Sequence, residues 1–340
     1  MPPSRTTDRP RFAPYADTGD RPNIVVDGSP NAATVLTLSH WPGLVQPPGC
    51  EHDLSAGMAF RYLDHPPPHA RAEVVTNNHF DQDGLVGVLA LSQPDEALRH
   101  RQLLLDLAAA GDFGTYRHRA AARASMAVSA LADLERSPLA DRLAGLGEAE
   151  RVGLLYQEVL PLTIPLATEP ERFRPLWAEE DARLTAAEAA ISSGRVTIDD
   201  RPDVDLAVIR LPGDGGDDLG GGHRFGHQHF GDIHPMALNN ASPRLRQLIV
   251  AEGRFRYVDR YETWVQYRSV RPRPRVDLAP LAEQLDALET GSGVWRADPP
   301  SALTPELVGR GSSLTPAAVV AAVEHHLRTA PAAWDPFRPR

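Results

Sequence analysis

The sequence predicts an α/β protein with a parallel sheet near the N-terminus, a largely helical middle region and an α+β C-terminal part. Short aliphatic runs alternate with helical segments up to residue 91, and this alternation is typical of a parallel sheet. From residue 95 to 192 the chain is rich in Ala, Leu, Glu and Arg at helical spacing. Strand-like runs return after residue 203. We therefore expect a loose arm over 1–21, an α/β domain with a helical insert over 22–198, and an α+β part over 199–340. The last boundary is soft, because both parts could share one sheet.

The first part should contain three short strands, at residues 23–27, 34–38 and 72–76. A helix is expected between the second and third strands, from Asp53 to Asp64. Leu54 and Met58 recur near one face of that helix, and Asp53 can cap its N-terminus. The third strand runs directly into a polar loop at residues 77–84, and an apolar helix is expected to start after it.

The rest of the chain divides into helices and strands by the same criteria. Helices are expected at 95–111, 117–136, 148–160, 178–192, 276–288 and 315–327, and strands at 204–211, 247–251, 255–258, 261–267 and 294–296. The predicted middle helices carry no motif of their own, so core packing is the simplest interpretation of their apolar faces.

Composition excludes several classes of function. The chain has 340 residues and a formal net charge of −10, which argues against an extended nucleic-acid coat or an anionic membrane surface as partner. It has no lysine, which excludes a P-loop lysine and a pyridoxal Schiff base. Cys50 is its single cysteine, which excludes disulfides, cysteine-built zinc sites and iron–sulfur clusters. No long apolar run and no apolar leader segment occurs, so we expect a cytoplasmic protein without membrane contact.

The loop Asn77-Asn78-His79-Phe80-Asp81-Gln82-Asp83-Gly84 carries the strongest chemical signal. Ligands of open α/β sheets bind at the carboxyl ends of strands, and this loop follows a predicted strand. Asp81 and Asp83 are close enough to repel each other, and a divalent metal would relieve that repulsion. His79 adds a nitrogen ligand that suits Mn²⁺ or Zn²⁺ better than Mg²⁺. Gly84 lets the backbone approach a ligand, and Asn77 lies beside it.

These residues, followed by Leu85-Val86-Gly87, resemble the first motif of DHH-type phosphoesterases, in which a strand leads into a D-x-D loop and then a helix. The resemblance covers about 20 residues. It implies that Asp81 and Asp83 are catalytic metal ligands, with His79 or Asn77 beside them, and that Mn²⁺ is the cofactor, with Zn²⁺ or Mg²⁺ as alternatives. The second motif of that family, an aspartate that ends another strand, cannot be placed. The Asp-His-His tripeptide is also absent.

A second candidate site is a histidine-rich stretch near residue 230. His227, His229, Asp232 and His234 fall within eight residues, and His227 and His229 would share one face of a strand. The pattern resembles the H-x-H-x-D-H loop of metallo-β-lactamase-type hydrolases, with one residue too many before the aspartate. These side chains could complete a metal site with Asp81 and Asp83. Alternatively, they could form the main site of a different metal hydrolase.

Several isolated residues are weaker candidates. His40 follows a predicted strand and could face the same sheet edge, and Asp112 ends a predicted helix. Arg254, Arg256 and Arg268 could bind a substrate phosphate, because guanidinium groups pair well with phosphate oxygens.

The sequence thus favours a metal-dependent hydrolase of phosphoester or phosphoanhydride bonds with one or two divalent ions. Its substrate would be a small phosphorylated molecule or a short oligonucleotide, and a homodimer is compatible with the sequence. The alternative is a non-catalytic ligand-binding or interaction module with a DHH-like fold, which the missing later motifs favour.

Overall fold

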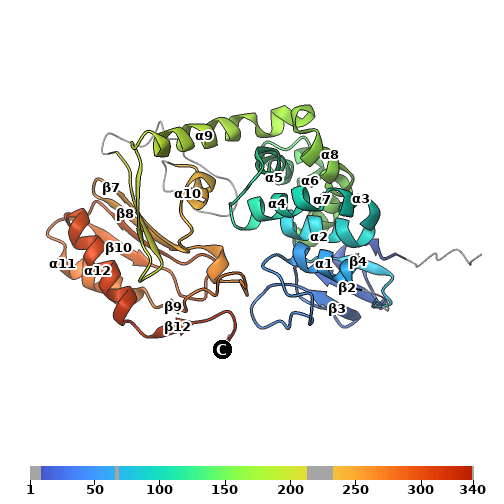
Figure 1. The fold of residues 1–340 in the computed structure, drawn as a ribbon, viewed down its shortest axis with the longest axis horizontal. Coiled ribbons are helices and arrows are strands. Elements are labelled where there is room, and N and C mark those ends of the chain that lie inside the picture. The colour runs from blue at the N-terminus through green and yellow to red at the C-terminus, as the bar shows by residue number, and fades with distance from the viewer. Residues whose placement is uncertain (1–8, 66–68, 213–232, 339–340) are drawn as a thin grey trace, which may run out of the picture. The chain divides into compact units, whose positions relative to one another are not determined.

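A computed structural model describes residues 9–65, 69–212 and 233–338 of the chain (Figure 1). The chain divides into two compact units, Met1–Glu179 and Glu180–Arg340, and the division falls inside helix α9 (Arg174–Ser192). The boundary that the sequence suggests, between residues 198 and 199, would instead cut strand β5 (Thr197–Arg201). The two units are therefore described separately.

The first unit is built on a four-stranded sheet in which all strands are parallel, in the order β1-β4-β2-β3. The strands are β1 (Arg11–Phe12), β2 (Asn23–Val26), β3 (Thr34–Leu38) and β4 (Val74–Thr76). Every residue of β2 and β4 is buried, as expected for the inner strands of a parallel sheet. The prediction of an N-terminal parallel sheet is confirmed.

The expected loose arm does not extend over residues 11–17. Arg11 and Phe12 pair with Val74 and Val75, so β1 forms an edge of the sheet. The short 3-10 helix η1 (Tyr15–Asp17) follows. The chain is held there by backbone hydrogen bonds, including Ala13 N–H to Val75 O at 3.3 Å, which the polar composition of this segment does not reveal.

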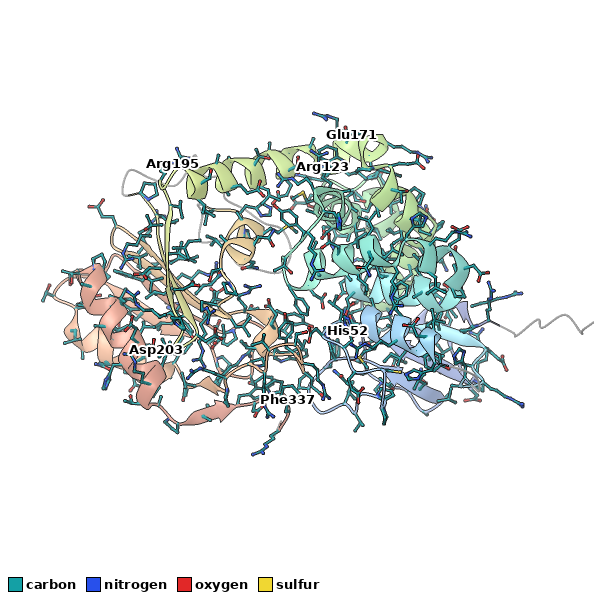
Figure 2. All side chains as sticks on the ribbon, viewed as in Figure 1. His52, Arg123, Glu171, Arg195, Asp203 and Phe337 are labelled. Atoms are coloured by element: carbon teal, nitrogen blue, oxygen red, sulfur yellow. The ribbon has the colours of Figure 1, made fainter. Side chains whose placement is uncertain are left out.

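Helices α1 (Ser55–Asp64) and α2 (Gln82–Ser92) pack against the sheet, and the other helices of this unit follow in the chain (Figure 1). These are α3 (Pro94–Arg99), α4 (Arg101–Asp112), α5 (Arg119–Ala132), α6 (Ala140–Leu143), α7 (Glu148–Val159), η2 (Leu160–Leu162), α8 (Thr163–Thr168) and η3 (Pro170–Phe173). Arg123 Nη1 of α5 donates a hydrogen bond to Glu171 Oε1 of η3 at 3.1 Å, which forms an ion pair between these two segments (Figure 2). The helical middle region is therefore confirmed.

The second unit contains a mixed six-stranded sheet in the order β10-β11-β8-β7-β6-β5, and a separate two-stranded sheet β12-β9. The remaining strands are β6 (Leu206–Arg210), β7 (Arg246–Ala251), β8 (Arg254–Asp259), β9 (Arg275–Val276), β10 (Val294–Ala297), β11 (Glu306–Arg310) and β12 (Ala332–Trp334). Only the β6–β7 pair of the large sheet is parallel. The two units share no strand among the described residues.

The core of the second unit lies between the large sheet and two helices, α11 (Ala279–Leu288) and α12 (Pro316–Thr329). Alternate residues of each central strand, such as Leu248 and Val250 of β7, face this core. The strand expected over 261–267 is wrong, because the chain there forms the 3-10 helix η5 (Tyr261–Thr263) and a turn. The α+β prediction is otherwise confirmed.

Across the three described ranges, no helix is both long enough and apolar enough to cross a membrane.

Candidate metal centre

The carboxyl ends of three neighbouring parallel strands bring polar residues to one edge of the first sheet. Asp27 directly follows β2, His40 follows β3 by two residues, and Asn77 directly follows β4. The register pairs Val26 with Leu38, so Asp27 and the residues after Leu38 leave the sheet side by side. The helix after β4 adds Asp81 as its N-cap and Asp83 in its first turn. Together with His79 of the same loop, five potential metal ligands therefore lie at this edge: Asp27, His40, His79, Asp81 and Asp83.

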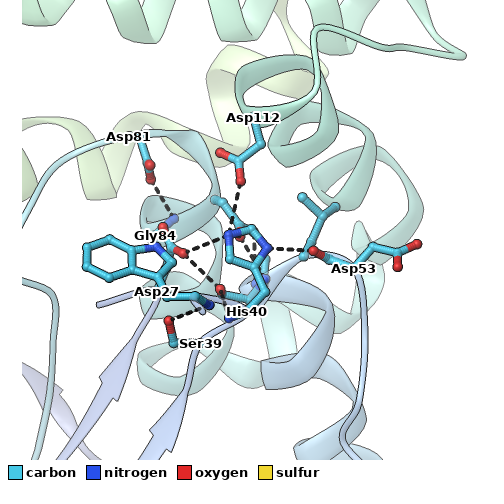
Figure 3. A network of polar contacts seen from close by, with 12 residues as sticks. Asp27, Ser39, His40, Asp53, Asp81, Gly84 and Asp112 are labelled. Atoms are coloured by element: carbon cyan, nitrogen blue, oxygen red, sulfur yellow. Dashed lines mark hydrogen bonds and ion pairs between the residues drawn. The ribbon is translucent and has the colours of Figure 1, made fainter. Parts of the chain in front are cut away.

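An inner group consists of Asp27, His40 and Asp83, and all three side chains are buried. Figure 3 shows Asp27, Asp53 and Asp112 around the His40 ring. His40 Nε2 lies 3.3 Å from Asp27 Oδ1 and 4.0 Å from Asp83 Oδ2. Asp112, at the end of α4, approaches the same nitrogen at 3.5 Å. His40 Nδ1 lies 2.5 Å from the carbonyl oxygen of Asp53. Because a carbonyl oxygen can only accept, this contact favours a proton on Nδ1 and leaves Nε2 facing the carboxylates of Asp27, Asp83 and Asp112. This carbonyl–histidine arrangement is common behind metal-bound imidazoles.

An outer group consists of Asp27, His79 and Asp81. His79 Nε2 lies 3.2 Å from Asp27 Oδ2 and 2.8 Å from Asp81 Oδ2. The side chains of His79 and Asp81 are 29% and 30% exposed, whereas Asp27 is 1% exposed. The Trp41 ring lies against the His79 ring, with 5.2 Å between centroids. The outer group is thus open to solvent on one side.

Asp27 belongs to both groups. One carboxylate oxygen faces the inner histidine and the other faces the outer histidine. Ser55 Oγ also donates to Asp27 Oδ1 at 2.8 Å, which fixes the carboxylate. The backbone of Asp27 has a φ of +53°, a conformation that few residues other than glycine adopt and that aspartate tolerates better than most. Such backbone strain is frequent at functional sites.

Helix α1 holds the second aspartate of the loop. The backbone N–H groups of Ser55 and Ala56 donate to Asp83 Oδ2 and Oδ1 at 2.7 and 2.8 Å. Asp83 therefore satisfies the first N–H groups of α1, where the sequence suggests Asp53 as the cap. The position at the positive end of a helix also favours a negative charge.

The electrostatics of the centre reflect the crowding of its carboxylates. Burial raises the pKa of Asp83 well above its usual range, and the charges of Asp27 and Asp81 add to the increase. Burial also opposes ionisation of Asp27, but His79 and His40 outweigh it and lower the pKa of Asp27 to about 2. Burial disfavours the protonated form of His79, but Asp81 and Asp27 raise its pKa well above the usual value. The raised pKa values of Asp83 and His79 show that the crowded negative charge of this centre favours a bound positive charge, which a divalent cation could supply.

Gly84 gives room for polar side chains next to Asp81. A Cβ atom at this position would lie 2.1 Å from Asn77 Nδ2 and 2.6 Å from Tyr156 Oη, so any larger residue would displace them. Asn77 is fully buried, and its Oδ1 accepts a hydrogen bond from His79 N–H at 3.2 Å. Burial raises the pKa of Tyr156 well above its usual range, with a further contribution from the charge of Asp81.

The structure brings His79, Asp81, Asp83, Asn77 and Gly84 together, as the loop motif predicts. His40 and Asp112 also reach this centre. Sequence reasoning missed Asp27 as a ligand and Tyr156 altogether. A signal for Asp27 was present in the sequence. Asp27 directly follows the buried strand β2, just as His40 follows the neighbouring strand β3.

The histidine-rich candidate is only partly described. His227, His229 and Asp232 lie outside the described residues. His234 is buried in the second unit, where it is the N-cap of α10 (Pro235–Ala241). Its Nδ1 accepts from Met236 N–H at 3.2 Å, and its Nε2 lies 3.0 Å from Glu180 Oε1. These contacts give His234 a structural role in its own unit.

The three candidate arginines also belong to the second unit. Arg254 and Arg256 lie on β8, and Arg256 forms an ion pair with Glu306 of β11. Arg268 lies beyond η5, 5.5 Å from the centroid of the Phe337 ring. A role in phosphate binding therefore stays a prediction for all three.

A protein-family model matches residues 8–338, and its description is a family of unknown function, DUF6687. Neither the curated proteins nor the solved structures gave a match. The resemblance to DHH-type phosphoesterases is not shown by these comparisons.

Proposed function

The chain belongs to DUF6687, a family of unknown function, and from the geometry of its own site we propose that it is a metal-dependent hydrolase of phosphoester or phosphoanhydride bonds that uses two divalent ions. One observation carries the proposal. Two groups of three potential ligands share a single carboxylate, Asp27, whose two oxygens face different histidines. A carboxylate that faces two cation positions is the arrangement expected for a pair of metal ions rather than for one.

The donor set fits divalent cations of intermediate character. Each group offers one imidazole nitrogen and carboxylate oxygens, and these atoms lie within 4.8 Å of one another. Imidazole favours Mn²⁺ or Zn²⁺ over Mg²⁺, so we take Mn²⁺ as the first candidate. Bound divalent ions would lower the pKa of a coordinated water and neutralise phosphate oxygens. His40 would bind through Nε2, with Nδ1 bonded to the Asp53 carbonyl.

The two groups differ in accessibility, which suggests different roles. The inner group is almost completely enclosed, with Asp112 as a further carboxylate beside His40. The outer group has two partly exposed ligands, His79 and Asp81. We place the substrate on the outer side, because a catalytic metal needs a coordination position that water or substrate can reach.

We infer the class of bond that is hydrolysed from the chemistry of paired divalent ions and from the sequence of the loop after β4. Pairs of divalent ions at carboxylate-rich sites serve phosphoryl chemistry in many enzymes, and residues 77–87 resemble the first motif of DHH-type phosphoesterases. The substrate we propose is a small phosphorylated molecule or a short oligonucleotide. The alternative, a ligand-binding module without turnover, would use the same residues.

The test combines metal analysis with an activity screen on the full-length untagged chain. Metal content is measured by elemental analysis after purification without chelator and dialysis against Mn²⁺. Hydrolysis of p-nitrophenyl phosphate, bis-p-nitrophenyl phosphate and pyrophosphate is then followed with and without Mn²⁺. Asp81→Asn and Asp83→Asn serve as site variants, and Asp203→Asn, at an exposed position of the second unit, serves as the matched control.

We expect about two equivalents of metal and a Mn²⁺-dependent turnover that both site variants lose and the control keeps. Metal binding without turnover on any phosphate ester would favour the binding module. Absence of bound metal, or full activity in both site variants, would refute the proposed function.

A further inference from the structure

Tyr156 of α7 is a fully buried residue whose ring is held on two sides. The Phe12 ring stacks on it with 4.9 Å between centroids, and the Phe80 ring meets it edge-on at 5.2 Å. Phe80 belongs to the loop that carries His79 and Asp81. The phenol can therefore change its position little, and its hydroxyl group has a fixed direction.

The hydroxyl group points to a small polar space next to the outer metal group. Tyr156 Oη, Asn77 Nδ2 and Asp81 Oδ1 all lie within 3.2 Å of the point that a Cβ of residue 84 would occupy. Tyr156 Oη and Asn77 Nδ2 are both buried, and neither makes a hydrogen bond of regular geometry with a described residue. The Asn77 side chain lies beside the phenol, close enough to interact with its hydroxyl group. Asn77 Oδ1 is already used by His79 N–H. Two buried hydrogen-bond donors thus lie in the same small space as Asp81 Oδ1 without a well-formed acceptor, which is unfavourable in a protein interior.

Cation binding would change the surroundings of Asp81. In the structure, Asp81 Oδ2 bonds His79 Nε2 at 2.8 Å, and Oδ1 accepts Gly84 N–H at 2.8 Å. A cation between His79 and Asp81 must replace the first bond, because Nε2 and Oδ2 would then both bind the ion. The aspartate would lose one of its two restraints, and only Gly84 N–H would still orient it.

We propose that Tyr156 is a positioning residue for Asp81, whose hydroxyl group donates to the carboxylate when Asp81 holds the outer ion. Asn77 Nδ2 orients the hydroxyl group by donating to Tyr156 Oη, which can accept one hydrogen bond and donate another. A phenol carries its proton at neutral pH, so the donor is always available. Gly84 is needed because any side chain there would separate these groups. This inference rests on the proposed metal function.

The test is the isosteric substitution Tyr156→Phe in the full-length chain, with Mn²⁺ binding measured by titration calorimetry and metal-free stability by thermal unfolding. We expect the outer ion to bind 10- to 100-fold more weakly, in the range found when partners of metal ligands are removed. The inner ion should bind as in the wild type. The metal-free melting temperature should change little, because the hydroxyl group makes no hydrogen bond of regular geometry and loses only its contact with the Asn77 amide.

Tyr257→Phe is the matched control. Tyr257 is also fully buried, but its hydroxyl group donates to Asp259 Oδ1 at 3.0 Å in the second unit. This variant should lower the metal-free melting temperature and leave both Mn²⁺ affinities unchanged.

The binding measurements distinguish a failure of the Tyr156 positioning role from a failure of the proposed metal function. If the wild type binds two ions and Tyr156→Phe binds both equally well, the positioning role is refuted and the metal centre stands. A fall in metal-free stability without a selective loss of the outer ion would also refute it, because that is the signature of a purely structural role. A wild type that binds no second ion would refute both proposals.

Discussion

Asp27→Asn is the substitution that tests the shared carboxylate most directly. Asparagine is close to aspartate in size and tolerates the positive φ of this position, and its amide oxygen can still accept the hydrogen bond from Ser55. It cannot bind two cations with two anionic oxygens. We therefore expect the metal-free protein to keep its fold, with a lower stability because His40 and His79 lose a charged partner, and the metal-loaded protein to lose the binding of both ions.

The expected loss of metal-induced stability follows from how many of the two ligand groups each variant disrupts. An ion that binds only the folded state at a free concentration of 100 Kd stabilises it by about 2.7 kcal/mol. Two ions would contribute about 5 kcal/mol, which raises the melting temperature of a unit of this size by roughly 10–20 °C. Asp27→Asn leaves neither group with three ligands and should remove nearly all of this increase. Asp81→Asn disrupts only the outer group and should leave about half of it.

The assay is thermal unfolding of the full-length chain with and without Mn²⁺, together with titration calorimetry for the number of ions bound. The expected order of metal stabilisation is wild type, then Asp81→Asn, then Asp27→Asn near zero. The reasoning is refuted if Asp27→Asn keeps the full stabilisation. Equal losses in both variants would also contradict it, since two sites that share only Asp27 cannot give that result.

Three further predictions concern individual residues. Gly84→Ala should lower the free energy of unfolding by about 1–3 kcal/mol, because its Cβ would lie 2.1 Å from Asn77 Nδ2; Gly147→Ala, with no contact closer than 3.5 Å, is the control and should cost less than about 1 kcal/mol in the same thermal assay. Arg275→Lys should cost about 2–4 kcal/mol in urea unfolding, because the buried guanidinium donates to one hydroxyl and three carbonyl oxygens that lysine cannot all reach; an unchanged midpoint would contradict this. Burial opposes ionisation of Glu289, but hydrogen bonds from serine and tryptophan donors lower its pKa to about 2, so its contribution to stability is present above the unfolded pKa of about 4.3 and is lost as the pH falls toward 2. The difference in unfolding free energy between wild type and Glu289→Gln should therefore shrink over that window, and a difference that does not depend on pH would rule this out.

Much of the fold could be predicted from the sequence because its elements carry local signals. The parallel strands are short aliphatic runs, and the middle helices repeat their apolar residues at helical spacing. The errors occurred where tertiary contacts override local preference. Arg11 and Phe12 become a strand only because β4 offers a free edge. Tyr261 lies in a β-rich run but begins a 3-10 helix, with Arg260 O accepting Thr263 N–H at 2.9 Å.

Some residues of the candidate site could likewise be predicted from local sequence, and others only from the tertiary structure. The sequence by itself determined the loop from Asn77 to Gly84, because its ligands are contiguous and follow a recognisable strand. Only the tertiary structure decided that Asp27 is the residue common to two ligand groups and that His40 faces it. These residues are far apart in the chain, and the parallel register of β2, β3 and β4 brings their carboxyl ends to one edge of the sheet. Strand order is set by long-range pairing and burial, which no local pattern in the sequence specifies.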